Sequence, residues 1–149
     1  MADQGGARPD LAAMLHPLVR GLIAAELPVL ARHGISMWGY IVLNALDGGP
    51  ARTQAALAQA IGADKTRIIG TLDELQQAGL ITREPDPADR RVRLLAITEA
   101  GRQIRAATQS DIQASEDRLL ARLPTGDRQA FLRVARELSA LPPEEIAGG

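Results

Sequence analysis

Apolar residues recur at spacings of three and four near the start of the chain. Between 10 and 33 they are Leu11, Leu15, Leu18, Val19, Leu22, Ile23, Leu27 and Leu30. This spacing places them on one helical face and predicts an amphipathic helix over the range. Pro17 and Pro28 lie inside it. Because each proline removes a helical hydrogen-bond donor, we expect them to bend or interrupt the helix.

Three shorter helices are predicted next, each opened by a residue that favours the N-cap position. The caps are Ser36, Thr53 and Asp64, and the helices end before the Gly-Gly-Pro of 48–50, near Ile61 and near Gln77. Gly62 turns the chain between the second and the third of these helices. Two short helices joined by a glycine-containing turn form the helix-turn-helix pattern, which many helical proteins share.

A β-hairpin is predicted directly after this pattern. Residues 80–83 begin an extended segment and residues 92–97 read as a returning strand. Between them the Pro-Asp-Pro-Ala-Asp of 85–89 favours a turn, because its prolines fix φ and withhold donors. A minimal strand near Ala51 would complete the sheet. A helix-turn-helix followed by a hairpin with an arginine-bearing tip indicates a winged helix.

Two more helices are predicted after the hairpin. One begins at Thr98-Glu99 and runs to about Leu123, and another follows Pro124 to about Leu141 with Phe131, Leu132, Ala135 and Leu138 facing inward. The predicted fold is mainly α with a small β-wing, in the order α-α-α-α-β-β-α-α. We expect one folded domain, with a winged helix-turn-helix core at 36–97. The flanking dimerisation helices lie at 10–35 and 98–141, and the flexible ends at 1–9 and 142–149.

Composition narrows the class of protein. The 149 residues suit one domain, and 46% of them are apolar, which is typical of globular proteins. No cysteine is present, which excludes disulfides, thiolate nucleophiles and thiol redox sensing. No apolar run approaches the roughly 18 residues of a membrane span, and 1–10 resembles no secretory signal. We therefore expect a soluble, cytoplasmic protein with no membrane partner. Its net charge of −1 gives no strongly basic footprint.

Several stretches resemble the multiple-antibiotic-resistance regulator (MarR) family of winged-helix transcription factors. They are Ser-Met-Trp at 36–38, Leu-Ala-Gln-Ala-Ile-Gly-Ala-Asp-Lys at 57–65, Leu-Gln-Gln-Ala-Gly-Leu-Ile-Thr-Arg at 75–83, Asp-Pro-Ala-Asp-Arg-Arg at 86–91 and Thr-Glu-Ala-Gly-Arg at 98–102. The resemblance covers 36–104, about half of the chain. It implies a homodimer whose first and last helices interlock, usually a repressor whose DNA affinity falls when a small ligand binds.

The predicted DNA contacts lie on the helix after Asp64, which should enter the major groove, on the wing, and at the start of the preceding helix, where Thr53 and Gln54 could contact the DNA backbone. They are Thr53, Gln54, Lys65, Thr66, Arg67, Ile69, Gly70, Asp73, Asp89, Arg90, Arg91 and Arg93. Lys65 and Thr66 suit phosphates, and Arg67 suits a bidentate contact with guanine. The resemblance places a wing arginine, steadied by Asp89, in the minor groove. The outward positions can also be read as an ordinary solvated charged face.

Two positions of the recognition helix depart from the family pattern. Ile69 and Gly70 stand where relatives mostly carry polar or basic side chains. Ile69 can touch a thymine methyl, whereas Gly70 has no side chain to read a base. Base specificity is therefore expected to rest more on DNA shape than is usual in the family.

The remaining candidate residues concern a small-molecule effector and the dimer. Around the family's ligand position lie His16, Arg20, His33, Trp38 and Tyr40. A tryptophan among aliphatic residues is more often a core anchor, however, and isolated histidines are more often partly exposed structural residues. The predicted dimer interface consists of Leu11, Leu15, Leu18, Leu119, Phe131, Leu132, Leu138 and Leu141.

The sequence predicts neither a metal site, a cofactor nor an enzyme. Two isolated histidines lack a carboxylate cluster. The chain also has no phosphate loop and no nucleophile constellation. The leading hypothesis is a homodimeric repressor that binds a double-stranded, pseudo-palindromic operator and is released by an aromatic or anionic effector. The alternatives are a winged-helix dimer that acts as a protein-interaction or structural module, and a regulator without a small-molecule ligand.

Overall fold

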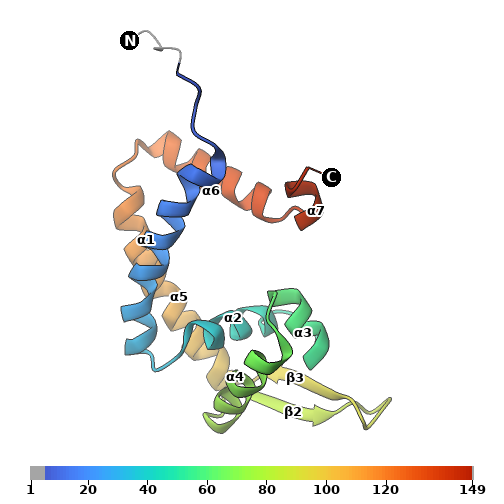
Figure 1. Ribbon diagram of the computed structural model, residues 1–149. Helices are drawn as coiled ribbons and strands as arrows, with labels where there is room; N and C mark the ends of the chain where they lie inside the picture. Colours follow the sequence, from blue (N-terminus) through green and yellow to red (C-terminus); the bar gives the residue numbers. More distant parts are fainter. Residues whose placement is uncertain (1–5, 149) are drawn as a thin grey trace. The chain divides into compact units, whose positions relative to one another are not determined.

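The computed structural model describes residues 6–148, which form seven helices and a three-stranded antiparallel sheet (Figure 1). The elements are α1 (Leu11–Arg32), α2 (Met37–Leu46), β1 (Arg52–Thr53), α3 (Gln54–Ile61), α4 (Lys65–Gln77), β2 (Ile81–Pro85), β3 (Arg93–Ile97), α5 (Glu99–Leu120), α6 (Thr125–Ser139) and α7 (Pro143–Ile146). The chain divides into two compact units, one ending at Ile112 and one beginning at Gln113. Each unit is described by itself.

The first unit contains the winged helix. Its sheet has the order β1-β3-β2, with the β2–β3 ladder running from Ile81 opposite Ile97 to Pro85 opposite Arg93. The minimal strand predicted near Ala51 is confirmed as β1, which pairs with β3. Helices α2, α3 and α4 gather beside this hairpin (Figure 1). Their shared core consists of fully buried aliphatic side chains, among them Val42, Leu43, Leu57, Leu72 and Leu95.

The three predicted caps are confirmed. The Ser36 hydroxyl accepts a hydrogen bond from the Gly39 amide at 3.0 Å, and the Thr53 hydroxyl accepts one from the Ala56 amide at 3.1 Å. Asp64 caps α4 in the same way. Gly62, the turn residue between α3 and α4, has a φ of 67°, a conformation that side-chain-bearing residues rarely adopt.

The prolines of α1 are expected to bend or interrupt the helix, and the structure shows that they do not interrupt it. Pro17 and Pro28 both lie inside one continuous helix of 22 residues. Each proline removes only one hydrogen-bond donor, and the leucine- and alanine-rich flanks have high helix propensity.

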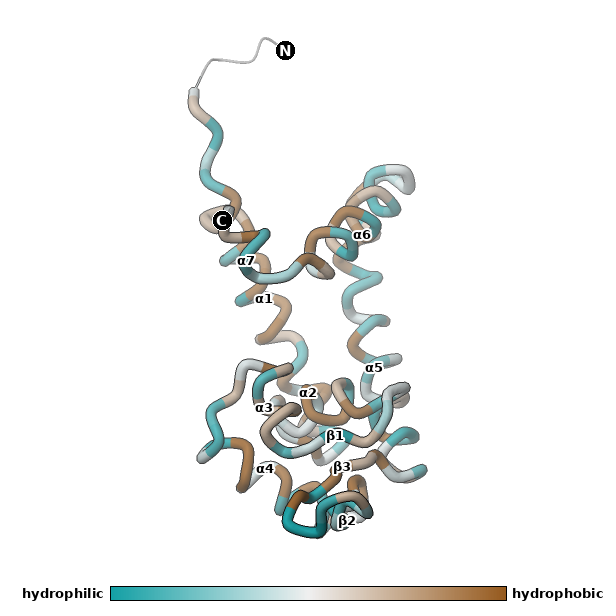
Figure 2. Tube along the Cα trace, turned by 90° about the vertical axis from the view of Figure 1, so that its right-hand side faces the viewer, coloured by the Kyte–Doolittle hydropathy of each residue, from teal (hydrophilic) through white to brown (hydrophobic). Residues whose placement is uncertain are grey.

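Helix α1 contains no uninterrupted apolar run of membrane-span length, but its overall composition is apolar. By length and composition alone it could cross a membrane, and little of it is buried within the chain. Figure 2 shows its predominantly hydrophobic colouring. Leucines and alanines dominate the helix, and the polar side chains of His16, Arg20 and Glu26 interrupt its apolar stretches. The core helix of a soluble protein and a signal sequence share this length and composition.

The second unit differs from the sequence prediction in two respects. The short helix α7 lies in the tail that was expected to be flexible, where Pro143 opens the helix and Glu144 and Glu145 complement its N-terminal dipole. In α6, no residue is buried. The inward-facing apolar side chains predicted there are instead exposed: Phe131 is 39% exposed and Leu138 is 53% exposed. These residues form an apolar face, which one chain alone leaves uncovered.

Candidate nucleic-acid interface

Helix α4 is held to the core by one face and exposes the other. Ile68, Leu72 and Leu75 are buried. The predicted DNA-facing residues of this helix are all exposed: Lys65, Thr66, Arg67, Ile69, Gly70 and Asp73. The periodicity of the buried residues, read from the sequence, therefore identified the free face correctly.

The N-terminus of α4 is capped by the carboxylate of Asp64. The Asp64 carboxylate accepts hydrogen bonds from the Thr66 amide at 2.7 Å and the Arg67 amide at 3.4 Å. These bonds stabilise the charged form and lower the pKa of Asp64 below its usual value. Because the carboxylate accepts from these two amides, they are not free to bind a phosphate at this end of the helix.

Asp73 is engaged within the protein. Its carboxylate forms an ion pair with Arg83 of β2, whose side chain is 19% exposed. This pair joins the exposed helix to the first strand of the wing. Sequence reasoning named Asp73 as a DNA contact and did not single out Arg83. The structure places the Asp73 carboxylate where it can orient α4 through Arg83.

The wing tip is a folded turn. The Asp86 amide donates to the Val92 carbonyl at 2.8 Å, and the Asp86 carboxylate accepts from the Ala88 amide at 2.9 Å. The Asp89 carboxylate accepts from both the amide and the Nε of Arg91, each at 3.2 Å. Asp89 thus holds the base of a guanidinium side chain that is 91% exposed.

Two further wing arginines accompany Arg91. Arg90 and Arg93 are exposed, and Arg93 is paired with Pro85 in the sheet register. Thr53 caps α3 and Gln54 begins it, and both residues are half-buried. The Thr53 hydroxyl serves as a cap, so its lone pairs are partly used by the Ala56 amide.

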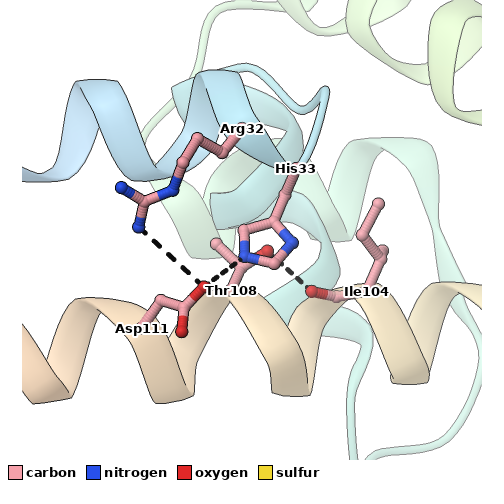
Figure 3. A network of polar contacts seen from close by, with 5 residues as sticks. All are labelled: Arg32, His33, Ile104, Thr108 and Asp111. Atoms are coloured by element: carbon pink, nitrogen blue, oxygen red, sulfur yellow. Dashed lines mark hydrogen bonds and ion pairs between the residues drawn. The ribbon is translucent and has the colours of Figure 1, made fainter.

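A polar network joins the end of α1 to α5, as Figure 3 shows. His33 Nε2 lies 2.7 Å from Asp111 Oδ2, and Arg32 lies 4.0 Å from the same oxygen. Beside them the buried Thr108 donates its hydroxyl to the Ile104 carbonyl at 2.6 Å. Sequence reasoning listed His33 without its partner, because a contact across 78 positions leaves no local signal.

A second ion pair joins α2 to α5. Arg105 Nε lies 3.1 Å from Asp47 Oδ2, and Arg105 Nη1 contacts the side-chain oxygens of Asn44 and Gln109 at 3.3 and 3.2 Å. The Arg105 side chain is 17% exposed. Sequence reasoning missed this pair as well. Both networks fix α5 against the winged helix within the first unit.

The candidate effector residues occupy different environments. His16 and Arg20 are exposed on α1, Trp38 is half-buried, Tyr40 is 8% exposed, and His33 is paired with Asp111. Among residues 6–148, no group of three or more His, Asp or Glu side chains could hold a metal ion.

The predicted dimer residues are mostly exposed in the single chain. Leu18 is half-buried, and seven others range from 38% to 55% exposed: Leu11, Leu15, Leu119, Phe131, Leu132, Leu138 and Leu141. Met14, Val19, Ile23 and Leu27 extend the apolar surface of α1.

Comparison with known proteins agrees with this geometry. Residues 33–92 match the sequence model of the MarR family. A transcriptional regulatory protein for the hcr operon of Thauera aromatica is 28% identical over 145 residues, covering 89% of this chain and 87% of that protein. The transcriptional regulator HosA of Escherichia coli O111:H- is 30% identical over 99 residues, covering 66% of this chain and 73% of HosA.

Solved structures of the repressor CouR are similar over nearly the whole chain. CouR from Rhodococcus jostii RHA1 bound to p-coumaroyl-CoA superposes with a TM-score of 0.71 at 26% identity, covering 89% of this chain and 94% of CouR. CouR bound to a 23-mer DNA duplex gives a TM-score of 0.74 at 27% identity, covering 93% and 99%. The chain therefore belongs to the MarR family of winged-helix transcriptional regulators, which are DNA-binding proteins and not enzymes.

Proposed function

We propose that this chain is a cytoplasmic, homodimeric repressor of a pseudo-palindromic operator, released by a small aromatic or anionic effector. The observation that carries the proposal is the pairing of an exposed α4 face with a wing arginine already held in place by Asp89. These are the two elements that a winged helix presents to adjacent grooves of a duplex. In the assembly, 36–97 would read DNA while 10–35 and 98–141 would dimerise.

Helix α4 is the reading element for the major groove. Arg67 is exposed and near the helix N-terminus, where a guanidinium can make a bidentate contact with guanine. Lys65 and Thr66 would contact phosphates beside it, with Thr53 and Gln54 contacting the backbone from the start of α3. Asp73 would keep the helix oriented through Arg83.

The wing would enter the minor groove. Arg91 projects from a turn that is fixed by Asp86 and Asp89, so little side-chain freedom at its base is lost on binding. A narrow A·T-rich minor groove has an enhanced negative potential that attracts such an arginine. Arg90 and Arg93 would add phosphate contacts.

A second copy of the chain would cover the apolar faces of α1 and α6. Leaving this many large aliphatic side chains exposed is unfavourable in water, and patches of this kind mark interfaces. His16, Arg20 and Glu26 within α1 favour a protein partner over a lipid interior, because polar and charged groups are expensive inside a bilayer. Twofold symmetry would then place two α4 helices on half-sites about 10 base pairs apart.

Effector release is supported by CouR, which has been solved with a DNA duplex and with p-coumaroyl-CoA. Of the candidate effector residues, His16, Arg20 and Trp38 retain accessible surface for a ligand. A regulator without a ligand is the second candidate, because Tyr40 is buried and His33 is already paired with Asp111. Membership of a DNA-binding family favours both over an interaction module.

The test is binding to the DNA flanking the protein's own gene, titrated across salt concentration against a scrambled duplex. We expect specific binding whose log K falls with log[salt] by ~0.9 per phosphate contact. Arg67→Ala and Arg91→Ala should weaken specific DNA binding. Arg122→Ala, which changes an exposed arginine that is not among the proposed DNA contacts, should not weaken it. Equal binding to the scrambled duplex, or full affinity in both interface variants, would contradict the proposal.

Effector control is tested on the same complex. A compound that binds the dimer and acts as an effector must shift operator affinity, and the operator must shift affinity for the compound equally. An aromatic carboxylate or its thioester that binds without any shift would favour the ligand-independent regulator.

A further inference from the structure

Gly70 leaves a gap at the centre of the exposed face of α4. Successive helical residues are offset by roughly 100°, which places Gly70 opposite the buried face formed by Ile68, Leu72 and Leu75. A Cβ built at Gly70 would meet no atom within 4 Å, and the residue has no positive φ. The fold therefore does not need glycine at this position, although glycine weakens a helix relative to alanine.

Ile69 lies next to this gap and is 46% exposed. Within 36–97, all of which the structure describes, it is the one large apolar side chain that is exposed. Around it the same face carries polar side chains, including Lys65, Thr66 and Asp73. An isolated aliphatic group beside bare backbone, on the face that meets DNA, indicates an apolar feature in the surface it contacts.

We propose that Ile69 reads the 5-methyl group of a thymine, and that Gly70 allows α4 to approach the bases closely enough for it to do so. The inference rests on the proposed placement of α4 in the major groove. There the thymine methyl is the apolar feature of the base edges, and an aliphatic side chain can pack on it. Gly70 acts as a specificity-determining position because adding any side chain would hold the helix away from the groove.

The experiment starts by selecting duplexes from a randomised library with the wild-type protein. Each thymine of the selected half-site is then replaced by uracil, which removes the methyl and keeps every hydrogen-bonding group. We expect one position at which uracil weakens binding by about fourfold per half-site, the effect of exposing one methyl group. The partial exposure of Ile69 predicts that its variants fold, which thermal unfolding checks.

Variants at Ile69 assign the effect to its side chain. Ile69→Ala should bind thymine and uracil duplexes equally, at the wild-type affinity for uracil, while Ile69→Val should keep the discrimination. Equal binding of both duplexes by the wild type, or discrimination that survives in Ile69→Ala, would overturn the proposal while leaving DNA binding itself intact. If the selection enriches no sequence, the proposed function fails together with the inference.

The variant Gly70→Ala distinguishes an effect on the approach of α4 to DNA from an effect on the stability of the fold. The variant should melt a few degrees higher, because alanine favours the helix and its Cβ meets open space. It should nevertheless bind the selected duplex several-fold more weakly. Gly126→Ala, in α6 with no atom within 4 Å of the added Cβ, is the matched control that should leave affinity unchanged. Full affinity in Gly70→Ala would refute the role of the gap.

Discussion

Arg83 on β2 pairs with Asp73 on α4, joining the wing to the recognition helix ten positions earlier in the chain. The Arg83 side chain is mostly buried, whereas Asp73 is 54% exposed. A pair of this kind contributes little to stability compared with the core, because its acidic partner stays in water. The pair instead links α4 to the first strand of the wing, the two elements that we propose contact DNA, and so restricts their relative orientation.

Breaking this pair should impair DNA binding more than folding. We expect Asp73→Asn and Arg83→Gln each to weaken operator binding several-fold while lowering the free energy of unfolding by about 1 kcal/mol or less. The double variant should lose no more affinity than the worse single variant, because both remove one interaction. Glu137→Gln, which breaks the exposed Arg133–Glu137 pair of α6, is the control. Additive losses of affinity would show that Asp73 contacts DNA independently of Arg83.

Gly101 should be intolerant of any side chain. A Cβ there would lie 2.2 Å from the Leu80 carbonyl oxygen and 2.8 Å from Ile97 Cγ1, so α5 would have to move away from the sheet. We expect Gly101→Ala to destabilise the protein by at least roughly 1–3 kcal/mol, measured by urea unfolding. Gly126→Ala has open space at the new Cβ and should be neutral or stabilising. Equal stability of the two variants would contradict the close approach.

The Asp64 cap should make stability fall in acid. Its amide hydrogen bonds lower the folded pKa below the usual 3.8, so the ionised cap stabilises the fold above that value. The contribution is lost as the pH falls through the lower folded pKa. We expect Asp64→Asn, which keeps an acceptor without the charge, to be less stable near neutrality and to converge with wild type in acid. Parallel unfolding curves at every pH would argue against the charged cap.

Glu116 on α5 should affect the pH dependence of stability in the opposite direction to Asp64. Burial, with a smaller contribution from Asp117, raises the pKa of Glu116 above its usual 4.5. The protonated form is therefore favoured in the folded state, and its stabilising contribution is lost as the pH rises through the folded pKa. We expect Glu116→Gln to be more stable than wild type at neutral pH and equal to it in acid. A Glu116→Gln variant with the wild-type free energy of unfolding at neutral pH would contradict this effect of burial.

Much of the winged helix could be predicted because its signals are local. The caps Ser36, Thr53 and Asp64 each bond to an amide two or three positions away, and the spacing of Ile68, Leu72 and Leu75 marks the buried face of α4. Single-residue signals predicted the structure wrongly where the surrounding residues favour a helix. The two prolines remain within α1, and α7 forms in a tail that composition alone made appear flexible.

The sequence by itself determined the order of the elements, the exposed face of α4 and the turn that carries Arg91, since each depends on hydrogen bonds and periodicities spanning a few residues. Only the tertiary structure decided that Asp73 meets Arg83, that Arg105 meets Asp47 and that His33 meets Asp111. These partners lie on different elements, and their distances depend on how the whole core packs. Packing also decided that the fold requires glycine at 101 but not at 70. A Cβ at 101 would collide with neighbouring atoms, whereas a Cβ at 70 would meet open space.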